Sequence, residues 1–207
     1  MPRPAAVGGA SVPRPAEPVS DPTEPFPPPK GYRQLRKGRS SNPGFYYFIT
    51  TNLMNRRPLL KSEDAADEVK RSIHWMEEAG RWTCISYVLM PDHIHLVIRL
   101  GENSSLPGCM KTFKSYTANR ISKLTSASFP IWQDGYFDHR FRTDGKFFQV
   151  LFYVFWNPVE AGLVEPFSMD YPHWDCREPY RSQLIEEFPW LKGLHEKGTL
   201  WSPERRG

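Results

Sequence analysis

Two histidines separated by a single residue carry the strongest chemical signal in this sequence. His93 and His95 lie in the apolar, β-branched run of residues 88–98, which is typical of a β-strand. Side chains on a strand alternate between its two faces, so both imidazoles point to one face while Ile94 points to the other. Two nitrogen donors on one face form a candidate metal site. A strand-face histidine pair is more often solvated or hydrogen-bonded, so the metal interpretation needs partners from elsewhere in the chain.

A tyrosine and an amide on a predicted helix are the second candidate for chemistry. The helix should begin after residue 145 and end at Asn157-Pro158, and apolar side chains surround most of it. Its polar residues are spaced by three, four and four positions, which puts them on one stripe: Lys146, Gln149, Tyr153 and Asn157. Such a stripe either faces a functional site or forms hydrogen bonds with nearby backbone, and the pattern alone leaves both interpretations open.

The surrounding elements predict an α+β fold. Alternating and β-branched runs indicate four strands, at residues 45–53, 81–90, 93–100 and 136–142. Two amphipathic helices are expected between them, at residues 62–78 and 106–124, the first with Ser62 as its N-cap. The order β-α-β-β-α-β is that of the ferredoxin-like fold, an antiparallel sheet with helices on one face. The apolar helix that carries Tyr153 follows this core.

Length and composition indicate one domain with a long N-terminal tail. The chain has 207 residues, and ten of its 21 prolines lie among the first thirty. With little apolar surface to bury, residues 1–30 are expected to form a disordered or polyproline-like tail. Residues 31–44 are expected to be a basic linker or arm, residues 45–190 the folded domain, and residues 191–207 a C-terminal tail.

Cysteine usage and hydropathy favour a cytoplasmic protein. The three cysteines, Cys84, Cys109 and Cys176, are odd in number and form no CxxC pair, which argues against a disulfide framework or a zinc knuckle. We expect no secretory signal and no membrane span, because no run of 18 apolar residues is present. The formal net charge of +4 leans toward an anionic partner such as nucleic acid.

Together, the histidine pair and the tyrosine stripe resemble the single-tyrosine HUH transposases of the IS200-like family, and in particular the REP-associated tyrosine transposases. The resemblance spans residues 31–190, and the block MPDHIHLVI followed at this distance by YVFWNPVEAGLV is specific. It is carried by four stretches: residues 45–60 (FYYFITTNLMNRRPLL), 87–100 (YVLMPDHIHLVIRL), 110–120 (MKTFKSYTANR) and 131–165 (IWQDGYFDHRFRTDGKFFQVLFYVFWNPVEAGLVE). Downstream of Glu165 the chain departs from the family pattern.

The resemblance implies a metal-dependent endonuclease and strand transferase that acts on single-stranded DNA, often beside a hairpin. By this likeness His93 and His95 are ligands of a Mg²⁺ or Mn²⁺ ion, and Asn157 completes the metal site. Tyr153 is then the nucleophile that forms a 5′-phosphotyrosine and frees a 3′-hydroxyl. A phenol with a pKa of about 10 is a poor nucleophile at neutral pH, so it needs a nearby cation. Imidazole and amide ligands leave the choice between Mg²⁺ and Mn²⁺ open.

A second tyrosine, Tyr116, is the rival nucleophile. It lies on the basic helix predicted at residues 106–124, whose solvated surface fixes a phenol less well than a packed helix does, so we favour Tyr153. We expect the basic helix and the N-terminal arm to bind DNA through these residues: Lys111, Lys114, Tyr116, Arg120, Lys123, Arg33, Arg36 and Lys37. A solvated basic linker is an equal interpretation of the arm when it is taken alone.

Two alternatives from other classes stay open at this point. One is a catalytically silent protein that binds single-stranded nucleic acid on the same fold. The other is a metal-dependent hydrolase without a covalent step, which the lack of a carboxylate or a third histidine at ligand spacing disfavours. The sequence also leaves open the DNA target and the choice between a monomer and a homodimer.

Overall fold

The computed structural model describes residues 41–141, 145–165, 171–189 and 191–192 of the chain. Most of the predicted N-terminal tail, basic arm and C-terminal tail lies outside the described residues, including Arg33, Arg36 and Lys37. The side chain of Lys146 lies outside them as well.

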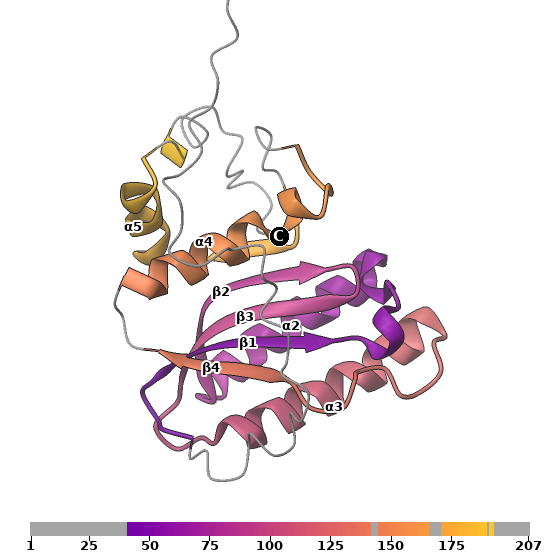
Figure 1. The fold of residues 1–207 in the computed structure, drawn as a ribbon. Coiled ribbons are helices and arrows are strands. Elements are labelled where there is room, and N and C mark those ends of the chain that lie inside the picture. The colour runs from indigo at the N-terminus through magenta and orange to yellow at the C-terminus, as the bar shows by residue number, and fades with distance from the viewer. Residues whose placement is uncertain (1–40, 142–144, 166–170, 190, 193–207) are drawn as a thin grey trace, which may run out of the picture.

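A five-stranded antiparallel sheet forms the centre of the described α+β fold (Figure 1). Its order is β4-β1-β3-β2-β5, and its strands are β1 (Tyr46–Asn52), β2 (Trp82–Met90), β3 (His93–Leu100), β4 (Phe137–Phe141) and β5 (Trp174–Cys176). The α-helices of the described ranges are α2 (Glu63–Glu78), α3 (Leu106–Thr125), α4 (Gly145–Glu160) and α5 (Tyr180–Glu187). Two 3₁₀ turns, η1 (Met54–Arg56) and η2 (Leu59–Lys61), connect β1 to α2. None of the helices in these ranges combines the length and the apolar character needed to cross a bilayer.

The sheet separates two hydrophobic cores. The helices α2 and α3 cover one face, and α4 covers the other, with α5 beside it (Figure 1). Ile49 and Leu96 belong to the α2–α3 core, whereas Phe48 and Val97 belong to the α4 core. The expectation of helices on one face therefore holds for α2 and α3 only. A sheet that is apolar on both faces needs a cover on each, and α4 supplies the second one.

Local signals explain the boundaries of α2. The Ser62 side chain accepts a hydrogen bond from the backbone N–H of Ala65, which confirms the predicted N-cap. Glu63 and Asp64 lie in the first turn, where their negative charges interact favourably with the positive end of the helix dipole. At the other end Gly80 has a φ of +65°, the left-handed conformation that commonly follows a helix. The following strand, β2, begins two residues later.

The predicted end of α4 at Asn157-Pro158 is wrong, because the helix continues through Pro158 to Glu160. A proline inside a helix removes one backbone N–H donor and crowds the carbonyl four residues earlier, yet the helix is completed beyond Pro158. The backbone N–H of Ala161 still donates to the carbonyl of Asn157 at 3.0 Å. Asn157 and Tyr153 are therefore on the same continuous helix.

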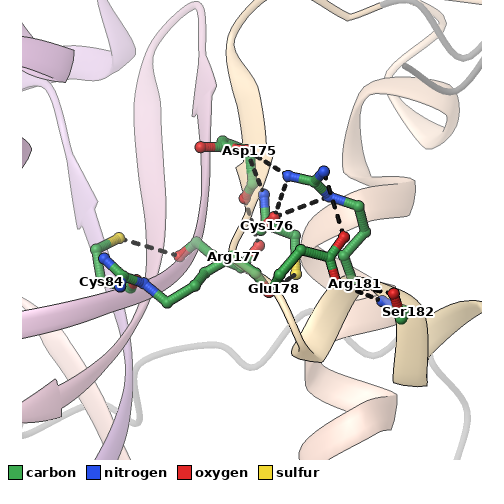
Figure 2. A network of polar contacts seen from close by, with 8 residues as sticks. Cys84, Asp175, Cys176, Arg177, Glu178, Arg181 and Ser182 are labelled. Atoms are coloured by element: carbon green, nitrogen blue, oxygen red, sulfur yellow. Dashed lines mark hydrogen bonds and ion pairs between the residues drawn. The ribbon is translucent and has the colours of Figure 1, made fainter. Parts of the chain in front are cut away.

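The segment after Glu165 adds two elements that the sequence did not predict, β5 and α5. Figure 2 shows the polar contacts of two arginines of this segment, Arg177 and Arg181. Arg177 Nε donates to the carbonyl of Cys84 on β2 at 2.9 Å, and its guanidinium also pairs with Glu77 of α2. Arg181 of α5 folds back onto the carbonyl of Cys176 through Nε at 3.0 Å. The C-terminal segment is thus bonded to β2 and α2 while α5 packs against α4.

Gly101 permits a close backbone approach where β3 leaves the sheet. A Cβ atom added there would lie 2.2 Å from the carbonyl oxygen of Gly80 and 3.0 Å from that of Arg81. The N–H of Gly101 donates to the same Arg81 carbonyl at 3.0 Å. This contact joins the end of the histidine strand to the turn between α2 and β2.

Gly101→Ala is expected to lower the free energy of unfolding by about 2 to 3 kcal/mol, because the backbone must move to admit the methyl group. Gly80→Ala is the matched control at the same junction: it has open space around its Cβ, so only its left-handed φ costs about 1 kcal/mol. Urea denaturation of both variants measures the difference. Equal effects would contradict the close approach at Gly101.

Candidate active site

The two histidines converge on one face of β3. In the antiparallel register His93 lies opposite Asn52 and His95 lies opposite Thr50, so these four side chains share the face that α4 covers. The Nε2 atoms of the two imidazoles are 3.1 Å apart, and the rings meet edge to face at a centroid distance of 4.8 Å. The alternation predicted from the sequence is therefore present.

The other ring nitrogen of each histidine is already occupied. Nδ1 of His93 lies 2.6 Å from Oδ1 of Asp92, and Nδ1 of His95 lies 2.8 Å from Oγ1 of Thr50. A carboxylate at Nδ1 favours the tautomer of His93 that carries its proton there, which leaves Nε2 with a lone pair. Both histidines therefore direct their remaining donor atom, Nε2, toward the space between them.

Burial keeps both imidazoles neutral. It lowers the pKa of His93, although a hydrogen bond with Asp92 acts in the opposite direction, and the charge of Arg56 lowers that pKa further. Burial lowers the pKa of His95 well below its usual value, assisted by the neighbouring His93 and by Arg56, while a hydrogen bond with Asn157 opposes these effects. Neutral imidazole is the form that binds a metal ion.

Tyr153 of α4 packs directly against the histidine pair. Its ring lies 5.3 Å from that of His95, at an interplanar angle of 71°. Phe48 of β1 contacts both groups: its ring stacks on His95 at 5.4 Å and meets Tyr153 edge to face at 5.9 Å. The phenol and the imidazoles are thus brought together from β3 and α4, which are far apart in the sequence.

Asn157 lies one turn after Tyr153 and is 8% exposed. Its Nδ2 donates to the backbone carbonyl of Tyr153 at 3.2 Å. This bond uses an N–H of the amide, so the amide oxygen is left as an acceptor near His95, whose pKa a hydrogen bond with Asn157 raises. An imidazole pair and an amide oxygen therefore lie on adjoining elements.

This donor set fits a divalent cation. Neighbouring ligands of an octahedral ion about 2.1 Å away are about 3.0 Å apart, close to the observed 3.1 Å between the two Nε2 atoms. Among the described residues no group of three or more histidine, cysteine, aspartate or glutamate side chains is arranged to hold a metal. The fit is thus to a cation held by two imidazoles and one amide, with its remaining positions filled by water or substrate.

Sequence reasoning missed the roles of Asp92 and Arg56. Asp92 uses both carboxylate oxygens, one toward His93 and the other toward Arg56 Nε at 2.7 Å. Asp92 directly precedes His93 in the sequence, so its closeness to the histidine could have been predicted. Because it lies between two predicted strands, it was interpreted only as a turn residue. No sequence signal connected Arg56 with Asp92, because the contact is long-range.

The basic residues of α3 lie on the other side of the sheet from the histidines, since α3 packs in the core opposite α4. Lys111 and Lys123 are exposed. Lys114 donates to the backbone carbonyl of Gln133 at 2.7 Å and also to that of Gly135. The structure therefore brings Tyr153, but no residue of α3, to the histidine pair.

Arg120 and Tyr116 contact Glu68 of α2. Arg120 Nε lies 3.2 Å from a carboxylate oxygen of Glu68, and Arg71 pairs with the same carboxylate. Burial alone would raise the pKa of Glu68, but hydrogen bonds from Arg71, Arg120 and Tyr116 lower it overall. Tyr116 is 52% exposed and belongs to this contact between two helices rather than to the histidine site.

Comparison with known proteins identifies the family. The sequence pattern of the family described as "Transposase IS200 like" matches residues 42–154, which include both histidines and Tyr153. The chain belongs to the IS200-like transposase family. Membership of the IS200-like transposases implies transposase activity. Asn157 lies just beyond the matched range.

Two relatives extend the comparison of this IS200-like transposase. A Haemophilus influenzae protein named as a REP-associated tyrosine transposase is 26% identical over 165 residues, which cover 72% of this chain and 89% of the relative. A solved structure of a REP-associated tyrosine transposase bound to a REP hairpin aligns with a TM-score of 0.55 and 20% identity. That alignment covers 79% of this chain and 88% of the other, and it supports the shared fold.

The packing of the two histidines predicts different effects of their removal from the IS200-like transposase. His95 is 4% exposed and stacks on Phe48, so His95→Ala should lower the free energy of unfolding by about 2 to 3 kcal/mol. His93→Ala should cost less than about 1.5 kcal/mol, because His93 is only partly buried. Urea denaturation without metal measures stability, and calorimetric titration with MnCl₂ should show weaker binding by both variants; full Mn²⁺ affinity in either would contradict its role as a ligand.

Proposed function

We propose that this chain is a metal-dependent single-stranded DNA endonuclease and strand transferase that acts through a covalent 5′-phosphotyrosine intermediate. The observation that carries the proposal is the contact of the Tyr153 ring with His95, within a histidine pair whose Nε2 atoms converge. A nucleophile and a candidate cation site on one sheet face are what phosphodiester cleavage by a phenol requires. The strand order β4-β1-β3-β2 supports the ferredoxin-like class of HUH nuclease core.

Tyr153 supplies the nucleophile in this proposal. Its phenolic oxygen loses its proton to solvent and attacks the scissile phosphorus, the bond from phosphorus to the 3′-oxygen breaks, and that oxygen takes up a proton as a 3′-hydroxyl. The DNA on the 3′ side of the break becomes linked to the tyrosine through its 5′-phosphate. Attack by another 3′-hydroxyl on this link rejoins the DNA and releases the phenol.

His93, His95 and Asn157 would hold the divalent ion, Mg²⁺ or Mn²⁺. When bound, the cation supplies positive charge to the phosphate oxygens and so assists a nucleophile that is weak at neutral pH. Asp92 and Thr50 hold the two imidazole rings through their Nδ1 atoms. The apolar contacts of Phe48 with His95 and Tyr153 exclude water from the inner side of the site.

The C-terminal segment keeps Tyr153 in place. Phe188 stacks on Phe152 at 4.5 Å, and Trp174 meets Phe155 edge to face at 4.8 Å, so α4 is held between the sheet and this segment. A nucleophile must be held within about 0.5 Å of its productive position. We therefore include β5 and α5 in the functional domain, residues 45–190.

We further propose that the substrate contains a hairpin, because the structurally similar relative is named as bound to a REP hairpin. Lys111 and Lys123 are the exposed cations of α3 that would contact phosphates, with Lys114, Tyr116 and Arg120 contributing less because each is engaged within the fold. The basic arm with Arg33, Arg36 and Lys37 is the second candidate. The protein would act as a monomer or a homodimer.

Tyr153→Phe should abolish covalent attachment to a labelled hairpin oligonucleotide with a single-stranded flank, while leaving binding nearly intact, because one hydroxyl is removed from a packed helix. Denaturing gel electrophoresis after incubation with MnCl₂ detects the adduct. Tyr116→Phe is the matched control and should still form it, and EDTA should stop the wild type. An adduct that persists in Tyr153→Phe but not in Tyr116→Phe would make Tyr116 the nucleophile. Cleavage by the wild type without an adduct would indicate a hydrolase, and DNA binding without cleavage would indicate a catalytically silent protein.

The Lys111→Ala, Lys123→Ala double variant should bind single-stranded DNA more weakly and with a flatter salt dependence, because each lost phosphate contact removes about 0.7 from the log–log slope. Lys114→Ala removes the same charge from the same helix, but its main effect should be a loss of thermal stability, since its ammonium group binds backbone carbonyls. Fluorescence anisotropy across a NaCl series measures the slope. An unchanged slope in the double variant would exclude α3 from the DNA interface.

A further inference from the structure

The turn after β1 holds two residues in an unfavourable backbone conformation. Asn55 and Arg56 of η1 have φ values of 54° and 53°, and neither is a glycine. The left-handed region costs roughly 1 to 2 kcal/mol for an ordinary residue. Such strain persists only where the surrounding structure imposes it, and it gathers at functional sites.

Bonds on both sides of the turn impose this conformation. Before it, the N–H of Leu53 donates to the carbonyl of Asp92 at 2.9 Å, and that of Met54 donates to the carbonyl of Ile131 at 2.7 Å. After it, the guanidinium of Arg57 donates to three backbone carbonyls, those of Met54, Ser128 and Pro130. The backbone on either side of Arg56 is therefore fixed.

The strained turn directs the Arg56 side chain to the histidine site. Its Nη1 donates to Oδ1 of Asn52 at 2.7 Å, and its Nε lies 2.7 Å from Oδ2 of Asp92. The other oxygen of Asp92 lies 2.6 Å from Nδ1 of His93, so one carboxylate holds both the guanidinium and the imidazole. Within the described ranges Nη2 has no hydrogen-bond or ion-pair partner, and the Arg56 side chain is 51% exposed.

We propose that Arg56 binds a phosphate of the DNA strand at the histidine pair, and that Asp92 is the positioning residue that holds Arg56 and His93 in register. The inference rests on the proposed strand-transfer function. A guanidinium suits this task because two of its nitrogens can bind Asn52 and Asp92 while the third donates to a phosphate oxygen. A lysine, with a single nitrogen at its end, cannot make the three contacts in this geometry.

Arg56→Gly separates a role in binding from a role in folding, because glycine adopts a positive φ without strain. In a Tyr153→Phe background, which prevents cleavage, the variant should bind a single-stranded oligonucleotide about tenfold more weakly, with a salt slope lower by about 0.7 at constant MnCl₂. Its melting temperature should stay the same or rise. Arg99→Ala is the matched control: it removes one arginine of 50% exposure at the far end of β3, and its slope should equal that of the parent.

Covalent adduct formation with Tyr153 restored gives the second measurement. Arg56→Gly and Arg56→Lys should both form the adduct about 10- to 100-fold more slowly than the wild type. Glycine removes the guanidinium, and lysine keeps the charge but loses the paired contacts. Asp92→Asn should slow the reaction and also weaken Mn²⁺ binding about 10- to 100-fold. Arg56→Gly with wild-type slope and rate would overturn the inference while leaving the proposed function intact. A wild type that neither binds DNA nor forms an adduct would overturn both.

Discussion

The contact of α4 with the histidine face of the sheet is the constraint on which the rest of the site depends. Phe48 lies at its centre, because its ring touches His95 on the neighbouring strand and Tyr153 on the helix above. Phe48 contacts His95 and Tyr153 through its apolar ring, so it fixes their rings without using the hydrogen-bonding atoms of either residue. The site therefore has a preorganised inner wall, and its reactive atoms remain free for substrate.

Polar side chains hold the two histidines and Arg56 in place. Thr50 and Asn52 come from β1, and Asp92 comes from the turn before β3; each bonds to a histidine or to the arginine beside it. The antiparallel register supplies two of these partners automatically, since Thr50 lies opposite His95 and Asn52 lies opposite His93. A one-residue slip of β1 would turn both side chains to the other face of the sheet.

Sequence reasoning predicted the features that depend on local periodicity. The shared face of His93 and His95 follows from strand alternation, and the stripe with Tyr153 and Asn157 follows from helical spacing; both are present. The cover of the histidine face by α4 could not be predicted, because it depends on contacts between segments far apart in the sequence.

Long-range and short features were missed for related reasons. The contact between Arg56 and Asp92 depends on a strained turn that is held in place by bonds to distant segments of the chain. The strand β5 has three residues, which is too short for an alternating pattern to be recognised. Pro158 was taken as the end of α4, whereas the helix continues past it to Glu160.

The placement of α3 and the histidine pair on opposite faces of one sheet limits which nucleic acids can engage both. Packed layers are about 10 Å apart, so the outer surface of α3 and the reaction site are separated by on the order of 20 Å of protein. A strand that reaches both must travel around an edge of the sheet, so its path is longer than this direct distance. Fragments shorter than this occupy one surface at a time, which makes substrate length a selection criterion independent of base sequence.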